Sequence, residues 1–119
     1  MNNVMQQTDN LVEAIHASNE YAQYQMLQNA ISKDTNVYDR LNEFRRRNFE
    51  VQMTSNENSI DKSDSLRREY ADVLNRGEVK DFLSAEQRYV KMLRKMYHKL
   101  ENQLHVNINF LYNNWYFLP

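Results

Sequence analysis

Apolar side chains recur along the last third of the chain at alternating spacings of three and four residues. At about 100° per residue, this spacing places them within one narrow arc of an α-helix. The pattern predicts one unbroken helix from Val79 to Leu111, about 45–50 Å long, which exceeds the width of a small core. Such a helix needs partners to cover its apolar stripe. The stripe consists of Val79, Leu83, Glu86, Val90, Leu93, Tyr97, Leu100, Leu104, Ile108 and Leu111.

The scarcity of turn-forming residues constrains the remainder of the fold. The 119 residues include one Gly and one Pro, whereas a β-rich fold of this size needs several tight turns. We therefore expect an all-α fold, a single domain over residues 1–119 with about five helices. In this bundle the long C-terminal helix is expected to pack antiparallel to the third helix, because both carry near-heptad stripes.

Charge and cysteine content exclude several classes of function. The net charge is −1, which excludes a broad electrostatic attraction to nucleic acid or to anionic membranes, although not a local basic patch. There is no cysteine, so we expect no disulfide, no thiolate metal site and no iron–sulfur cluster held by this chain. No motif for another cofactor is recognised, and we expect none. The first residues lack the features of a signal peptide, and no apolar run approaches a membrane span. A cytoplasmic location is the simplest expectation.

Apolar periodicity predicts four helices before the long one. We expect them over about Val4–His16, Asn19–Lys33, Asn36–Asn56 and Lys62–Asn75. The first three are separated by short polar junctions, and no internal repeat relates them. The long fifth helix then follows directly.

Capping residues and one loop mark the predicted boundaries. Ser18 is expected to cap the second helix, and Asp34 or Thr35 the third, because their side-chain oxygens accept bonds from free amides. The polar stretch Thr54–Ser63 is the best loop candidate. Gly77 is expected just past the fourth helix, in the left-handed conformation that often ends a helix.

Two predicted apolar stripes each contain one polar residue. Asn48 lies within the stripe of the third helix, and Glu86 within that of the long helix. Because an unpartnered buried polar group costs about 1–3 kcal/mol, each needs a partner. We expect Asn48 and Glu86 to contact each other, an arginine or another subunit.

Two groups of basic residues are candidates for nucleic-acid contact. Arg45-Arg46-Arg47 fan around their helix, so a salt-bridged face with Glu43 and Glu50 is the favoured interpretation. A more coherent row shares one face of the long helix and could follow RNA phosphates without reading sequence. This row consists of Arg88, Lys91, Lys95 and Lys99.

Evidence for catalytic or metal chemistry is weak. One Glu-x-x-His motif occurs at Glu13 and His16, whereas carboxylate di-iron sites use two such motifs and further glutamates. The set His98, Glu101 and His105 is loosely spaced for zinc. No glycine-rich phosphate loop or nucleophile–base pair is present. We therefore expect no enzymatic activity, no metal site and no small-molecule substrate.

The C-terminal tail, Phe110 to Pro119, is unusually aromatic. It could fold onto its own bundle, dock on a second subunit or another protein, or insert at a membrane interface, of which the last is the least favoured. Together with the stripe of the long helix, it suggests a homo-oligomer, with a dimer as the simplest form. The candidate contact residues are Val90, Leu93, Tyr97, Leu100, Leu104, Ile108, Leu111, Trp115 and Phe117.

Several segments resemble the YlbF/YheA/YmcA family of small bacterial helical proteins. The resemblance spans about residues 4–111 and lies in the order of the segments Leu11–Tyr24, Asp34, Tyr38, Asn42–Arg45, Arg68–Tyr70 and Val79–Arg88. It implies an all-α fold, self-association and no enzymatic activity. The members that bind iron–sulfur clusters use cysteines, several in the C-terminal tail, so the lack of cysteine favours the YheA-like branch.

The resemblance also implies a biological setting. Some members act in a heteromeric complex that influences competence, sporulation and biofilm formation in Gram-positive bacteria and is linked to ribonuclease Y and mRNA processing. We therefore expect a non-enzymatic, oligomeric interaction or regulatory protein, with other YlbF/YmcA-type proteins as candidate partners. The alternative is an RNA-associated accessory factor that uses the basic row of the long helix.

Overall fold

The computed structural model describes residues 3–54 and 58–105, and in these ranges the chain forms six α-helices and no strand. The all-α prediction is therefore confirmed, including a long C-terminal helix. The helices are α1 (Asn3–His16), α2 (Asn19–Ser32), α3 (Thr35–Met53), α4 (Ser59–Glu69), α5 (Ala71–Leu74) and α6 (Gly77–Leu104).

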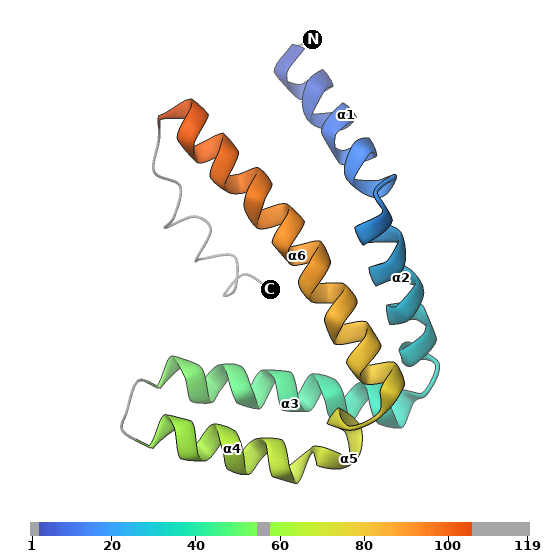
Figure 1. The fold of residues 1–119 in the computed structure, drawn as a ribbon, viewed down its shortest axis with the longest axis vertical. Coiled ribbons are helices and arrows are strands. Elements are labelled where there is room, and N and C mark those ends of the chain that lie inside the picture. Colours follow the sequence, from blue (N-terminus) through green and yellow to red (C-terminus); the bar gives the residue numbers. More distant parts are fainter. Residues whose placement is uncertain (1–2, 55–57, 106–119) are drawn as a thin grey trace.

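The helices form two arms that meet at one junction (Figure 1). In the first arm α2 and α6 lie side by side and antiparallel, and α1 extends this arm beyond the N-terminal end of α2. In the second arm α3 and α4 form an antiparallel hairpin. The expected pairing of α6 with the third helix is therefore wrong, because α6 lies along α2 instead. Tyr24 of α2 explains this pairing, since its ring stacks on both Phe82 and Tyr89 of α6 at centroid distances of 5.7 and 5.1 Å.

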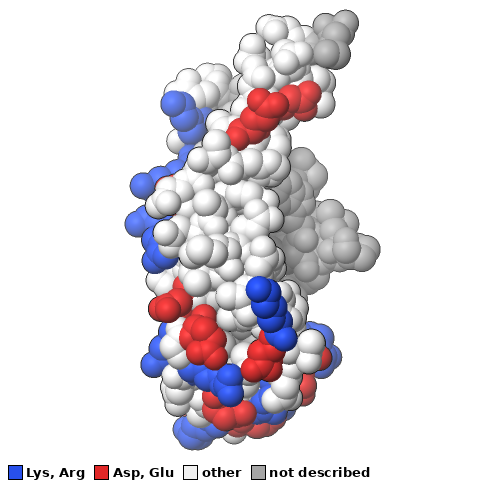
Figure 2. Space-filling model, turned by 90° about the vertical axis from the view of Figure 1, so that its right-hand side faces the viewer, with Lys and Arg blue, Asp and Glu red and all other residues white. Residues whose placement is uncertain are grey.

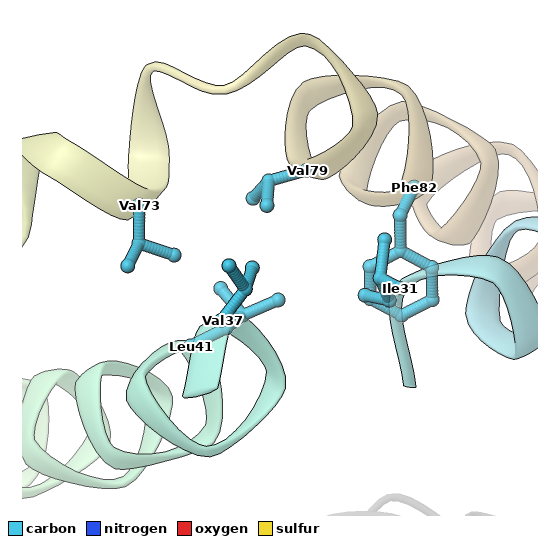
Figure 3. Packing of buried hydrophobic residues seen from close by; sticks show 6 residues of the cluster. All are labelled: Ile31, Val37, Leu41, Val73, Val79 and Phe82. Carbon is cyan, nitrogen blue, oxygen red and sulfur yellow. The ribbon is translucent and has the colours of Figure 1, made fainter. Parts of the chain in front are cut away.

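The core lies at the junction of the two arms. Six buried side chains from four helices pack there (Figure 3), and they are Ile31 of α2, Val37 and Leu41 of α3, Val73 of α5, and Val79 and Phe82 of α6. A second buried cluster of Phe44, Leu66 and Tyr70 extends from the junction into the α3–α4 hairpin. Burial of this apolar area supplies the main force that holds the arms together.

Two predicted N-caps are present in the structure. The Ser18 hydroxyl oxygen accepts a bond from the Tyr21 amide at 3.2 Å, and the Asp34 carboxylate accepts one from the Val37 amide at 3.3 Å. Both caps adopt the extended backbone that such positions favour. The local sequence therefore determines where α2 and α3 begin.

Other predicted boundaries are wrong. The expected fourth helix is interrupted at Tyr70, which separates α4 from α5. The polar stretch expected as a loop is partly helical, because α4 begins at Ser59 and α3 ends at Met53. Gly77 does not adopt a positive φ, and it is the first residue of α6. Only two residues separate α5 from α6, so Gly77 is already part of the next helix.

The long helix also ends earlier than predicted. It stops at Leu104, and His105 takes the left-handed conformation with φ 56° and ψ 37°. A non-glycine residue in this conformation ends the regular hydrogen bonding of a helix. The expectation of one unbroken helix to Leu111 is therefore wrong at its C-terminal end. The expected tail at about 110–119 lies outside the described residues.

Candidate association surface

The apolar stripe of α6 is buried at one end of the helix and exposed at the other. Near the junction, Val79, Phe82 and Ala85 are at most 1% exposed. Further along the helix Val90, Leu93 and Tyr97 are half-buried. At the far end Leu100 is 38% and Leu104 64% exposed. The stripe therefore continues beyond the part of α6 that its own chain covers.

Helix α1 exposes a second apolar stripe. None of its residues is buried, and its large apolar side chains are exposed by 66% at Val4, 55% at Met5, 38% at Leu11 and 44% at Val12. At the C-terminal end of α1, the centre of the His16 ring lies 4.7 Å from the centre of the Tyr21 ring of α2. Single exposed apolar residues are ordinary on a protein surface, but a row of them along one helix makes that helix a candidate for a binding surface.

The predicted contact residues divide between these regions. Leu100 and Leu104 lie on the exposed part of α6, while Val90, Leu93 and Tyr97 are partly covered. The remaining candidates lie outside the described residues, namely Ile108, Leu111, Trp115 and Phe117. The stripe of α1 was not among the predicted contact residues. The spacing of apolar residues in α1 was visible in the sequence. Whether another helix covers this stripe depends on the direction of α1 relative to α6, which the spacing does not determine.

The two polar residues of the predicted stripes have separate partners. Arg45 donates to the Glu86 carboxylate at 2.5 Å, and the side chains are 39% and 21% exposed. Asn48 accepts a bond from the Ser63 hydroxyl at 3.1 Å. Glu86 thus meets an arginine, which was one expected alternative, and Asn48 does not contact Glu86.

An aromatic row beside this ion pair links α2 to α6. Tyr89 contacts Tyr21 edge-on at 5.5 Å and stacks on Tyr24 at 5.1 Å. Burial raises the pKa of the Tyr24 phenol, and the Glu86 carboxylate raises it further, while Arg45 lowers it. This row was not predicted, because the tyrosines come from helices that are far apart in the sequence.

The Arg45-Arg46-Arg47 run forms a salt-bridged face, in agreement with the favoured interpretation. Besides the Arg45 pair, Arg46 lies 3.8 Å from Glu50, and Arg47 donates to Glu69 of α4. Arg47 also donates to the Tyr70 hydroxyl at 3.0 Å. Each arginine thus has a carboxylate partner within the chain.

The basic row of α6 has a different environment. Arg88 donates to the Ser84 hydroxyl at 2.9 Å. Lys91, Lys95 and Lys99 are exposed and form no salt bridge within the described part of the chain. Figure 2 shows this basic edge beside the acidic patch on α1. The row is therefore available for contact with an acidic partner.

No group of three or more metal-ligating side chains is found among residues 3–54 and 58–105. A shallow pocket of about 430 Å³ lies between α3 and α4. Its charged lining residues have both signs, and they are Arg47, Glu50, Lys62 and Glu69. None of the helices, within the described residues, is long and apolar enough to span a membrane.

Comparison with known proteins identifies the family. The family described as "Control of competence regulator ComK, YlbF/YmcA" matches residues 4–105. Neither a curated protein nor a solved structure matches the chain. The match covers both arms of the fold and most of the sequence. The chain therefore belongs to the YlbF/YmcA family, which is associated with control of the competence regulator ComK.

Proposed function

We propose that this protein is a non-enzymatic, cytoplasmic regulator that self-associates and acts through protein–protein contacts. The observation that carries the proposal is the set of exposed apolar side chains on α1 and at the far end of α6, hereafter the association surface. Its members are Val4, Met5, Leu11 and Val12 of α1 and Leu100 and Leu104 of α6. The family, which is associated with control of the competence regulator ComK, supports the regulatory role.

The energetics favour association through this surface. Complete burial of a Val, Leu or Met side chain contributes about 1.5–3 kcal/mol relative to leaving it exposed. Leu104 and Val4 have 64% and 66% of their surface still exposed in the single chain. Several such side chains, buried together, offset the translational and rotational entropy that two molecules lose on binding.

Charge substitutions on α6 test the proposal. Leu104→Asp places a carboxylate on the association surface without touching the core, because Leu104 lies in the last turn of α6. We expect the variant to remain helical and to lose self-association. Asn102→Asp is the matched control, since Asn102 is exposed on the opposite face of the same turn and its shape is nearly unchanged.

The measurement is molar mass by light scattering at several protein concentrations, together with helical circular dichroism. The proposal predicts an oligomer for the wild type and for Asn102→Asp, and a monomer for Leu104→Asp. A wild-type protein that remains monomeric over the whole concentration range would contradict it. An unchanged mass for Leu104→Asp would equally contradict the assigned surface.

The family suggests partners beyond a second copy. We propose that the protein also joins other YlbF/YmcA-type proteins in a complex that affects competence, sporulation, biofilm formation or mRNA processing. Co-purification of the chain with each such protein from the same cell tests this directly. Leu104→Asp should weaken co-purification, while Asn102→Asp should not.

A second candidate function is RNA contact, favoured by the exposed lysines of α6. Lys91, Lys95 and Lys99 have no carboxylate within salt-bridge distance in the described part of the chain. Phosphate binding by such a row loses affinity steeply as salt rises. Titration of fluorescent single-stranded RNA at low and high salt, with Lys→Gln variants at these positions, tests this candidate.

A further inference from the structure

Two apolar stripes of this chain diverge instead of covering each other. Helices α1 and α6 separate above the α2–α6 contact (Figure 1), and no Cα atoms of the two helices lie within 8 Å of each other. The stripe of α1 is the one described above. On the upper part of α6, Met92, Leu93, Met96 and Tyr97 are half-buried, and Leu100 and Leu104 are exposed. Each stripe therefore offers apolar surface to another molecule.

The two stripes match in length. Helix α1 has 14 residues, which corresponds to about 21 Å at 1.5 Å per residue. The segment from Val90 to the end of α6 at Leu104 is about as long, on the same rise per residue. A helix of the size of α1 would therefore extend along the half-buried and the exposed parts of the α6 stripe, from Val90 to Leu104.

The two helices carry opposite charge. Helix α1 contains Asp9 and Glu13 and no Lys or Arg. From Arg88 to Leu104, α6 contains five basic side chains (Arg88, Lys91, Arg94, Lys95 and Lys99) and one acidic side chain (Glu101). Figure 2 shows the acidic patch on α1 and the basic edge next to it as separate surfaces. Opposite charges beside two apolar stripes give a complementary pair of surfaces.

The flanks on which these charges lie define the relative direction of the two helices. Viewed from the N-terminus, Asp9 and Glu13 lie about 100° and 140° to one side of the centre of the α1 stripe at 3.6 residues per turn. Lys99 and Lys95 lie about 100° and 140° to the other side of the centre of the α6 residues Met92, Leu93, Met96, Tyr97, Leu100 and Leu104. When helices pack stripe to stripe, opposite flanks meet if the helices run parallel, as in parallel coiled coils. The charges therefore favour a parallel arrangement of α1 and α6.

Within one chain, α1 runs antiparallel to α6, because α1 descends towards the junction and α6 rises from it (Figure 1). A parallel α1 must therefore come from a second, inverted copy. A two-fold axis perpendicular to the long axis of the first arm produces this arrangement and makes it reciprocal.

We propose that two copies of this chain exchange their α1 helices, so that α1 of each copy packs parallel to the segment Val90–Leu104 of α6 in the other copy. The flank of α1 that carries Asp9 and Glu13 in one copy then lies beside the flank of α6 that carries Lys95 and Lys99 in the other, at both halves of the dimer. This inference deepens the proposed self-association and rests on it. It names the occupant of the α6 stripe as α1 of a second copy.

Reciprocal charge reversal in the full-length chain tests the arrangement. In variant A, Asp9→Lys and Glu13→Lys make α1 basic. In variant B, Lys95→Glu and Lys99→Glu make the facing side of α6 acidic. Each variant alone brings like charges together at both contacts, whereas a mixture of A and B brings opposite charges together at both contacts.

We expect the dimer dissociation constant of A and of B to rise about tenfold or more, and the mixture to form an A–B heterodimer of near wild-type affinity. Sedimentation equilibrium gives the constants, and native mass spectrometry identifies the heterodimer by mass. The effect should shrink between about 0.05 M and about 0.5 M salt as screening increases. A control variant with Lys62→Glu and Lys80→Glu, both exposed and away from the exchange, should dimerise like the wild type.

Each other outcome overturns the exchange in a distinguishable way. A monomeric wild type refutes the proposed self-association itself. A wild-type dimer with unaffected A and B, or with A and B that do not rescue each other, refutes only the exchange of α1. Loss of dimer on Trp115→Ala, with A and B unaffected, would make the C-terminal tail the occupant. Loss of RNA binding by B, with its dimer intact, would assign the basic row to RNA.

Discussion

Phe82 is the side chain whose truncation tests the described core most directly. It is 1% exposed, and it packs in the cluster that joins α2, α3, α5 and α6. Its ring stacks on Tyr24, and the Arg45 guanidinium lies 5.8 Å from the ring centre. Phe82→Ala therefore removes contacts with both arms at once.

The expected loss can be estimated from burial. Phe→Ala in a packed core costs about 3–5 kcal/mol, because the transfer free energy is lost and a cavity remains. A chain of 119 residues has a free energy of unfolding of about 6–18 kcal/mol at 0.05–0.15 kcal/mol per residue. The substitution thus removes a large share of the stability, and it should lower the Tm by about 10–20 °C.

The assay is urea denaturation followed by circular dichroism at 222 nm. All variants must be compared at one protein concentration, because self-association adds to apparent stability. Ile60→Ala is the control, since Ile60 is equally apolar but 74% exposed and should change stability by less than about 0.5 kcal/mol. A loss below about 1 kcal/mol for Phe82→Ala, or equal losses for the two variants, would refute the proposed position of the core.

Three further predictions follow from particular contacts. Tyr70→Phe removes the hydroxyl that donates to Glu43 at 2.6 Å from a residue that is 1% exposed, and should cost about 1–2 kcal/mol in the same denaturation assay; an unchanged midpoint would count against this bond. Gly77→Ala should stabilise the chain by about 0.4–1 kcal/mol, because the backbone has a negative φ and an added Cβ meets nothing within 4 Å; a lower Tm would contradict it. Tyr24 should titrate above its usual pKa, since burial first and Glu86 second raise that pKa. Because this pKa is higher in the folded than in the unfolded chain, the Tyr24 phenol contributes to the free energy of unfolding below about pH 10. This contribution is lost as the pH rises through the folded-state pKa. Absorbance titration against Tyr24→Phe measures this pKa, and Glu86→Gln should lower it; an unchanged value would show that the carboxylate has no influence.

The features that could be predicted from sequence are local ones. Ser18 and Asp34 were recognisable as N-caps because a cap involves a side chain and an amide only three residues away. The all-α class followed from the scarcity of turn-forming residues, which is a property of the whole composition. The apolar stripe of α6 was visible for the same reason, since helical periodicity is a short-range pattern.

The features that were missed depend on contacts between distant segments. The predicted fourth helix is interrupted at Tyr70, a buried residue whose hydroxyl donates to Glu43 in α3, and no local signal marks that position. The pairing of α6 with α2 arises from Tyr24 and its partners on α6, whereas near-heptad spacing alone favoured α3. Spacing shows which face of a helix is apolar, but it does not show which neighbour will cover that face.

The concentration of burial at the junction gives α6 a graded character along its length. The N-terminal end of α6 is anchored by fully buried side chains, while the C-terminal end extends away from the junction and leaves Leu104 exposed. Amide hydrogens near Phe82 should therefore exchange with deuterium only on global unfolding, and those near Leu104 by local fraying. Binding of a partner along the C-terminal half of α6 would slow amide hydrogen exchange in that half and make protection uniform along the helix. Hydrogen exchange of α6 would therefore report on association without any label.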